Sequence, residues 1–329
     1  MTKVVKVNDS RFLSGITEIP SLKIGNYEFI FEAELSDQAR RVAERELRET
    51  PERKKEAIAE LRRLLDQEKD LTYPDNEFWL VKFLRKCKYY PESALEMIKK
   101  YYDIKVKHPE YFYNFNINYY VGIANMKMGM VSPRRDHKGR RVLIGRIMKD
   151  FDLEAYSIEE LFKGANAGME VVSTEPDTQV NGIVGIIDLQ ELSLKHLKPL
   201  SPSLIRFAIK FSQDCVPLRI KGIHVLNESS IIDATYTIIK NFLSEKLRNR
   251  IYFHGNDYQS LHEFVPPNCL PKIYGGTIDI DPNQLPSVEE LLDQFSDFVS
   301  MCEKELEIIQ SYGYKRQDVE DDLIENTPL

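Results

Sequence analysis

The residues whose chemistry stands out in this sequence are basic, and they lie between residues 206 and 254. That segment has an excess of four positive charges in a chain whose net charge is −7. Arg219 and Lys221 alternate with an apolar residue, which places both side chains on one face of an extended segment. Lys246 and Arg250 have the spacing of neighbours on one helix face. The sequence therefore predicts two basic pairs that converge on one surface, with ordinary solvated charge as the alternative.

Motifs for catalysis or for a bound cofactor are missing from the sequence. It contains no G-x-G-x-x-G, no G-x-x-x-x-G-K-[ST] and no G-x-S-x-G. The 6 histidines include no pair with H-x-x-x-H spacing, and the 4 scattered cysteines form no C-x-x-C pair. We therefore expect no catalytic residues, no metal site and no cofactor. An enzyme that acts on lipids stays an alternative that only substrate turnover would support.

Two single residues have positions where acid–base chemistry is conceivable. His224 belongs to a predicted strand, where it would act as a base at the strand end or, as we favour, pack as a buried hydrogen-bonded histidine. Asp188 ends another predicted strand, and a catalytic acid would lie at that edge of a parallel sheet. The residues that follow Asp188 also fit a cap at the start of a loop, which is the interpretation we prefer.

The first elements that must position these residues are helical. Thr50 and Pro51 form an N-cap and first-turn pair, and the apolar residues that follow recur with a period of 3.6. Two further helices are predicted, one within 76–88 and one that begins at Pro91. Together they predict a small helical subdomain.

A different periodicity begins after residue 121. Three short β-rich segments, 142–147, 183–189 and 222–227, are separated by helical segments, which is typical of βαβ units and a mainly parallel sheet. The predicted starts of the two connecting helices are a capping box from Ser157 to Glu160 and the Ser201-Pro202 pair. A further helix is predicted from about Ser230 and a long amphipathic helix from Ser287. The fold class is α/β, and the predicted divisions are a flexible N-terminal arm (1–33), the helical subdomain (34–120), the α/β domain (121–280) and a C-terminal amphipathic helix with an acidic tail (281–329).

Composition narrows the choice of partners. The negative net charge and a pI near 5.6 argue against a general nucleic-acid binder. The longest apolar segment is far shorter than the roughly 18 residues that a membrane span needs, so any membrane contact is expected to be peripheral. The first ten residues show no secretory signal, and the cysteines show no disulfide framework. We expect a cytoplasmic protein.

Several segments, taken in order, resemble the CRAL-TRIO family. The chain has DNEFWLVKFLRKCKYYPESAL at 75–95, NGIVGIIDL at 181–189, PLRIKGIHVLN at 217–227, FLSEKLRNRI at 242–251, FHG at 253–255 and LPKIYGG at 270–276. Each motif is weak evidence alone, but the series has the family's order and spacing over about residues 50 to 300. The chain is most similar to the subgroup that includes alpha-tocopherol transfer protein, cellular retinaldehyde-binding protein and many insect relatives.

The resemblance implies a helical subdomain packed on a lipid-binding α/β domain, with a pocket between the sheet and a mobile helical lid. The positions that match ligand-contacting residues of the family are Ala165, Met169, Ile187, Ala208, Phe211, Ser212, Ile232 and Tyr236. The matching lid face consists of Ile231, Ile232, Tyr236, Ile239, Phe242 and Leu243. Ser229 and Ser230 would cap the lid helix and serve as its hinge. Each of these apolar residues has ordinary core packing as its alternative.

The resemblance also implies a role for the basic surface. In alpha-tocopherol transfer protein the residues that match Arg219, Lys221, Lys246 and Arg250 are basic and bind phosphoinositide headgroups. Multivalent contact between Lys or Arg and phosphate is suitable chemistry for such a site. One further arginine of the family motif corresponds to Cys87 here, which is flanked by two lysines.

These expectations combine into one functional hypothesis and one alternative. The hypothesis is a lipid-transfer protein that binds a single apolar ligand and opens its lid at membranes that contain phosphoinositides. Tocopherol, retinoid, carotenoid, sterol-like and phospholipid ligands are all compatible with the sequence. The alternative is a phosphoinositide-responsive membrane adaptor in which the pocket lipid is structural.

Overall fold

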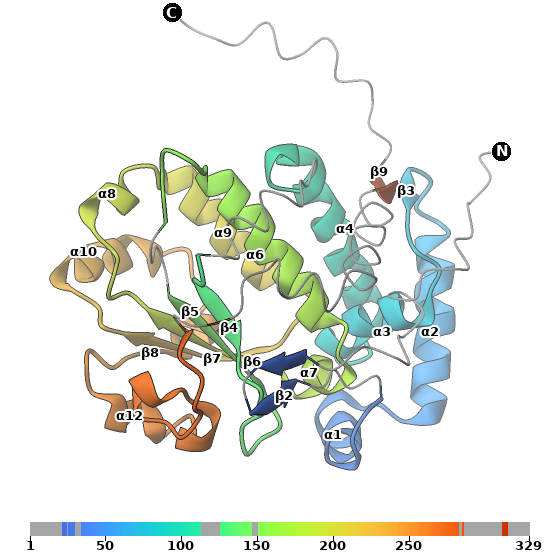
Figure 1. Ribbon diagram of the computed structural model, residues 1–329. Coiled ribbons are helices and arrows are strands. Elements are labelled where there is room, and N and C mark those ends of the chain that lie inside the picture. The colour runs from blue at the N-terminus through green and yellow to red at the C-terminus, as the bar shows by residue number, and fades with distance from the viewer. Residues whose placement is uncertain are drawn as a thin grey trace, which may run out of the picture.

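The computed structural model describes residues 22–24, 26–29, 34–112, 126–146, 151–282, 285 and 311–314. Figure 1 shows an α/β unit with a central sheet, and a group of helices from the N-terminal part of the chain packed at one side of it. The long helix predicted from Ser287 and the acidic tail lie outside the described residues, as does most of the predicted N-terminal arm. Within the described part of the chain, no helix is long and apolar enough to cross a membrane.

The N-terminal helices begin where their capping residues predict. Thr50 Oγ1 accepts a hydrogen bond from the backbone N–H of Arg53, and Asn76 Oδ1 accepts one from Phe78. Pro51 then occupies the first turn, so the predicted start of this helix is confirmed. The elements of this part are α1 (Asp37–Val42), the π-helix η1 (Ala43–Leu47), α2 (Pro51–Leu65), α3 (Glu77–Lys86), α4 (Pro91–Lys107) and η2 (Pro109–Tyr111).

Among the described residues, the main sheet has 5 strands in the order β4-β5-β6-β7-β8, and only the β4–β5 pair of this sheet is antiparallel. The bounds are β4 (Gly129–Val131), β5 (Arg141–Arg146), β6 (Ile183–Asp188), β7 (Ile220–Leu226) and β8 (Ile251–Phe253). The predicted parallel α/β fold is confirmed, and the three predicted strands correspond to β5, β6 and β7. The two short outer strands were not predicted.

Helices connect the parallel strands and cover one face of the sheet. They are α6 (Ile158–Ser173) and α7 (Pro176–Asn181) before β6, α8 (Leu194–Leu197) and α9 (Pro202–Asp214) before β7, and α10 (Ser230–Ile239) and α11 (Glu245–Arg248) before β8. Both predicted helix starts are confirmed: Ser157 and Glu160 form reciprocal hydrogen bonds, and Ser201 Oγ accepts from Leu204 N–H. Figure 1 shows α6, α9 and α10 on one side of the sheet and α12 (Tyr258–His262) on the other.

The predicted lid helix begins at Ser230 as expected, but its capping and its C-terminal end differ from the prediction. Ser229 occupies the N-cap position of α10, but its side chain makes no capping hydrogen bond. The helix ends at Ile239, so Phe242 and Leu243 lie in the turn that follows rather than on the helix face. The prediction that one helical stripe carries all six lid residues is therefore wrong at its C-terminal end.

Short terminal elements complete the described chain. The hairpin β1 (Leu22–Ile24) and β2 (Tyr27–Phe29) contacts the end of the α/β domain, because Tyr27 Oη accepts a hydrogen bond of 2.9 Å from Asp279 N–H. The remaining elements are β3 (Leu71–Thr72), η3 (Pro267–Cys269), η4 (Lys272–Tyr274) and β9 (Gly313–Tyr314), of which β3 and β9 pair with each other.

Candidate functional site

The two faces of the sheet are packed to different degrees. On the face toward α12, the side chains of Val142, Ile144, Val184 and Ile186 are 0–2% exposed. They pack against the segment that runs through α12 to η4. Because side chains alternate along a strand, the residues between them, Leu143 and Gly185, belong to the other face, and both are only partly buried. Among the described residues, packing is therefore incomplete around Leu143, Gly185 and Ile187, whereas Ile183 and Val225 on the same face are buried.

Gly185 marks the centre of that incompletely packed face. It lies on β6, the middle strand, between Leu143 of β5 and Ile223 of β7 in the sheet register. A Cβ added to Gly185 would have no described atom within 4 Å. Native protein interiors are close-packed, so space above the centre of a covered sheet is unusual. The space is bordered by Leu143, Ile187 and Ile223, which makes its floor apolar.

An aromatic cluster lies between α6, α9 and the end of the helical subdomain. Phe207 and Phe211 of α9 pack against Phe162 of α6 with ring centroids 5.1 and 5.7 Å apart. Tyr111 and Phe112, which follow α4, join the same cluster. The helical subdomain thus contributes aromatic side chains to the packing between α6 and α9.

The predicted pocket residues occupy four elements around this space. Ala165 and Met169 lie on α6, Ile187 on β6, Ala208, Phe211 and Ser212 on α9, and Ile232 and Tyr236 on α10. Phe211 is buried in the aromatic cluster, and Ala165 is exposed. The other six are half-buried, and the Ser212 hydroxyl donates to the carbonyl of Ala208 at 2.8 Å. Their contact with a ligand stays a prediction.

Contacts of α10 and the turn after it hold this region over the sheet. The Tyr236 ring meets Phe253 of β8 edge-on at 4.8 Å between centroids, and Phe253 is still 40% exposed. After the helix, Gln213 of α9 binds the backbone twice: its amide donates to the Phe242 carbonyl at 3.1 Å and accepts from Ser244 N–H at 2.7 Å. The backbone after α10 is therefore attached to α9 by one side chain.

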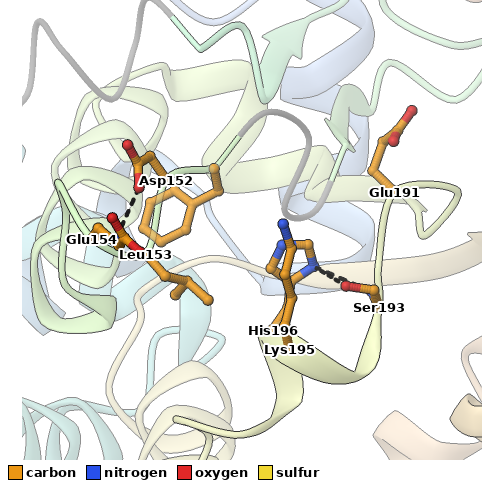
Figure 2. A pocket seen from close by; sticks show the side chains of 8 residues that line it. Asp152, Leu153, Glu154, Glu191, Ser193, Lys195 and His196 are labelled. Atoms are coloured by element: carbon orange, nitrogen blue, oxygen red, sulfur yellow. Dashed lines mark hydrogen bonds between the residues drawn. The ribbon is translucent and has the colours of Figure 1, made fainter.

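A separate hollow of about 700 Å³ lies between the turn before α6 and the turn that leads into α8. Figure 2 shows the side chains that line it, among them Asp152, Glu154, Glu191 and Lys195. Its Ser193–His196 pair, with Oγ and Nδ1 3.2 Å apart, is the capping box of α8. None of the predicted pocket residues is among those described as lining this hollow. Its exposed carboxylates make it unsuitable for an apolar ligand.

The predicted basic residues form a cluster at the start of β7. Arg219 Nη2 and Lys221 Nζ lie 2.8 and 3.4 Å from the same oxygen, Oε2 of Glu46 on η1. The hydrogen bond from Arg219 outweighs partial burial and lowers the pKa of Glu46 to about 2. A shared carboxylate places both cations on one side of the strand, as their alternation predicts.

Lys246 and Arg250 join the cluster, but they are not neighbours on one helix as predicted. Helix α11 ends at Arg248, so Arg250 lies beyond the helix and the predicted i, i+4 arrangement on one helix is wrong. Arg250 instead donates to the carbonyl of Ile220 in β7. Burial and the charge of Arg250 lower the pKa of Lys246 from its usual value. The two residues are therefore close, and both lie near β7.

One cation of the cluster was not among the predicted site residues. Lys86, at the end of α3, donates from Nζ to the carbonyl of Leu218, next to Arg219. Burial, followed by the charges of Lys246, Arg219 and Arg250, lowers its pKa to about 8. The residues of the two domains that meet here are more than 100 positions apart, so local spacing carries no signal of the contact.

The two residues with a conceivable catalytic role have structural contacts. Asp188 Oδ1 accepts from Gln190 N–H at 3.0 Å, which confirms the cap, and Oδ2 accepts from the Tyr274 hydroxyl at 2.7 Å. His224 is buried and hydrogen-bonded to His254, with their ring nitrogens 3.0 Å apart. Burial lowers the pKa of His224 to about 4, so the ring is neutral near pH 7. Both residues pack within the fold, as preferred from the sequence.

Metal and disulfide chemistry find no support in the part of the chain that the structure describes. No group of three or more His, Cys, Asp or Glu side chains there could hold a metal ion. Cys87, Cys215 and Cys269 are free thiols, and burial raises the pKa of each, to between about 11 and about 12.

The fold and these contacts define an α/β domain with a mainly parallel sheet, preceded by a helical subdomain, and sequence comparison identifies its family. Residues 125–276 match the CRAL/TRIO domain. The chain belongs to the CRAL/TRIO family, whose domains bind hydrophobic lipids and whose members are generally not enzymes.

Among its relatives are the clavesins. The chain is 30% identical to Clavesin-1 of Pongo abelii over 254 residues, which cover 75% of this chain and 70% of the relative. It is also 30% identical to Clavesin-2 of Homo sapiens over 259 residues, with 75% and 76% covered. A solved structure titled "Crystal structure of Sfh5" aligns with 80% of this chain and 98% of that chain, at a TM-score of 0.39 and 13% identity.

Proposed function

We propose that this protein binds one apolar lipid molecule between its sheet and helices α6, α9 and α10, and exchanges it at membranes that contain phosphoinositides. The observation that carries the proposal is the open, apolar space above Gly185 on a face covered by three helices. An apolar ligand in that space would lose contact with water, which contributes about 25 cal/mol per Å² of buried area.

The basic cluster supports the membrane half of the proposal. Arg219, Lys221, Lys246 and Arg250 lie at the start of β7 and in the connection between α10 and β8. The same connection begins with α10, whose Tyr236 packs against Phe253 of the edge strand β8 on the helix-covered side of the sheet. Phosphate contact with these cations would therefore occur close to the segment that must move for a ligand to leave. We propose that the protein works in the cytoplasm and is transiently peripheral to membranes.

The proposal of a bound apolar lipid is tested by identifying the molecule that copurifies with the protein. The expected result is one apolar lipid per chain by native mass spectrometry, with its identity established after extraction. Transfer of that lipid between phosphatidylcholine vesicles should accelerate when the acceptor vesicles contain phosphatidylinositol bisphosphate. The absence of both a stoichiometric ligand and transfer would contradict the proposal. Phosphoinositide binding with a lipid that never exchanges would favour the membrane adaptor instead.

The basic cluster is tested by the double variant Lys246→Ala, Arg250→Ala. Each basic residue near an anionic surface contributes about 1 kcal/mol, so binding to phosphoinositide vesicles should weaken by roughly tenfold or more. The bound lipid should stay in place, because neither side chain belongs to the apolar space. The matched control Lys138→Ala, Lys272→Ala removes the same charge from exposed sites elsewhere. Binding is measured by co-sedimentation with the vesicles. Equal binding by the two double variants would contradict a role of the cluster in membrane contact.

A further inference from the structure

Lys86 belongs to the helical subdomain, but its ammonium group lies at the start of β7 in the α/β domain. It is the last residue of α3, and its Nζ donates to the carbonyl of Leu218 immediately before β7. Arg250 donates to the carbonyl of Ile220, two residues further along the same backbone. Lys86 and Arg250 therefore bind the same short stretch of chain, on either side of Arg219.

The charges around Lys86 are mostly of its own sign. Lys246, Arg219 and Arg250 all act on it electrostatically. The one carboxylate described in contact with the cluster, Glu46, bonds to Arg219 and Lys221 and not to Lys86. An ammonium group has three donors, and the Leu218 carbonyl accounts for one of them. A half-buried cation held among other cations is a poor arrangement for stability and a suitable one for a multivalent anion.

A shallow groove of about 460 Å³ begins at this point. Lys86 and Cys87 line it together with Lys100 of α4 and Gln213 of α9, and it also contains three carboxylates, those of Glu92, Glu96 and Asp214. Lys86 is thus shared between the groove and the basic cluster. Because the carboxylates of the groove repel an anion, a phosphate would approach Nζ of Lys86 from the side of the basic cluster.

We infer that Lys86 is a fifth headgroup-binding residue, which supplies a positive charge next to the uncharged side chain of Cys87. The assignment rests on the proposed phosphoinositide site and deepens it. The shared ligand chemistry is an inositol ring with more than one phosphate group, either as a lipid headgroup or as a soluble molecule.

The assignment is tested with Lys86→Met, which keeps the length of the side chain and removes its charge. A charge-assisted hydrogen bond is lost, so affinity for vesicles with phosphatidylinositol bisphosphate should fall about tenfold. Lys86→Arg should restore most of it. Lys55→Met removes the same charge from an exposed side chain of α2 and should change affinity less than threefold. Vesicle affinity of Lys86→Met equal to that of the unsubstituted protein would overturn the assignment.

The pH dependence of binding gives a second measurement that needs no destabilising variant. Lys86 has a pKa of about 8, and a bound phosphate would raise it, so affinity should fall as pH rises from 7 to 9. Lys86→Arg stays charged in this range and should have a shallower profile. Lys221 and Lys246 also have lowered pKa values and preserve part of the slope, whereas Glu46 stays ionised and the thiol of Cys87 stays neutral. Identical profiles for the two proteins would count against Lys86.

Soluble inositol trisphosphate separates the two sources of the anion. If Lys86→Met weakens binding of both the vesicles and the soluble probe, the site recognises the headgroup itself. A loss confined to vesicles would mean that Lys86 adds only general surface charge, which overturns the assignment and leaves the proposed function intact. If the unsubstituted protein binds neither probe, the proposed headgroup site fails and this assignment fails with it.

Discussion

At the scale of single residues, two glycines of the sheet separate the packed face from the open one. A Cβ on Gly185 would meet no described atom within 4 Å, whereas a Cβ on Gly222 of β7 would lie 2.9 Å from Nε2 of His224. The register pairs Gly222 with Val184, so it belongs to the packed face. The same residue type therefore faces opposite environments in neighbouring strands.

The variant Gly185→Leu tests this difference. The new side chain should enter open space, so the free energy of unfolding of the ligand-free protein should change by less than about 1 kcal/mol. It would also occupy volume needed by the lipid, so the fraction of chains with bound lipid in native mass spectra should fall. Gly222→Leu is the matched control, because overpacking of a filled face costs about 1–3 kcal/mol or more. Full lipid occupancy in a stable Gly185→Leu protein would show that the ligand does not lie over the centre of the sheet.

Residue-level prediction from the sequence succeeded where the signal was local. The alternation of Arg219 and Lys221 correctly placed both cations on one side, because strand geometry fixes side-chain direction. Glu46 and Lys86 were missed as members of the cluster, because they reach it from the helical subdomain through contacts that local spacing does not encode. Functional roles for all of these residues stay predictions.

At the scale of elements, the connection from α10 to β8 joins the apolar space to the basic cluster. Its helix α10 covers the sheet next to Phe253, and its last residues carry Lys246 and Arg250. The paired hydrogen bonds from Gln213 hold its middle, and the guanidinium of Arg206 lies 4.9 Å from the centre of the Phe242 ring. Release of this connection would have to break the Gln213 contacts.

Gln213→Ala is therefore expected to accelerate lipid exchange. Two backbone groups lose their partner in the closed state and regain water in the open state, so opening should become easier by about 1–2 kcal/mol, or roughly 5- to 30-fold in rate. The measurement is transfer between vesicles without phosphoinositides, which keeps the basic cluster out of the comparison. Gln259→Ala, an exposed glutamine of α12, is the control. An unchanged transfer rate for Gln213→Ala would mean that the connection from α10 to β8 is not the segment that moves when the lipid leaves.

Elements were predicted well where several signals agreed. The central strands β5, β6 and β7 were predicted from short β-rich segments separated by helical ones. The helices capped by Thr50, Ser157 and Ser201 combined a hydrophobic pattern with a cap. The short strands β4 and β8 contain 3 residues each, too few to show a period. The lid stripe was extended through Leu243 because apolar spacing continues after the helix has ended.

At the scale of the whole molecule, α3 links the helical subdomain to both proposed binding regions. Lys82 Nζ lies 3.0 Å from Glu170 of α6, in a pair that is about nine-tenths buried. Arg85, one turn further along, binds Glu49 and Gln179, and Lys86 ends the helix at the basic cluster. One helix therefore fixes the position of a pocket-covering helix relative to the basic cluster. No sequence pattern indicated this, because each partner is remote along the chain.

Removal of the Glu170 carboxylate tests how much this junction contributes. Glu170 also accepts a hydrogen bond of 2.7 Å from the Tyr101 hydroxyl, and Lys105 lies buried nearby. Burial raises the pKa of Glu170, but Lys82 and Lys105 outweigh it and hold the pKa below 4.5. Glu170→Gln would leave two buried ammonium groups without their carboxylate, so the free energy of unfolding should fall by about 3–5 kcal/mol at pH 7.

The pH dependence of that loss distinguishes the charge from simple packing. A carboxyl group with a lowered pKa in the folded state stabilises the fold fully above its unfolded value of 4.5, and the contribution disappears as pH falls through the folded value. Denaturant unfolding should therefore show a difference between Glu170→Gln and the unsubstituted protein that narrows below pH 4.5. Asp103→Asn, which breaks an exposed pair with Lys107, should cost less than about 1 kcal/mol. A difference for Glu170→Gln that is equally small would mean that the Lys82–Glu170 pair does not stabilise the junction of the two domains.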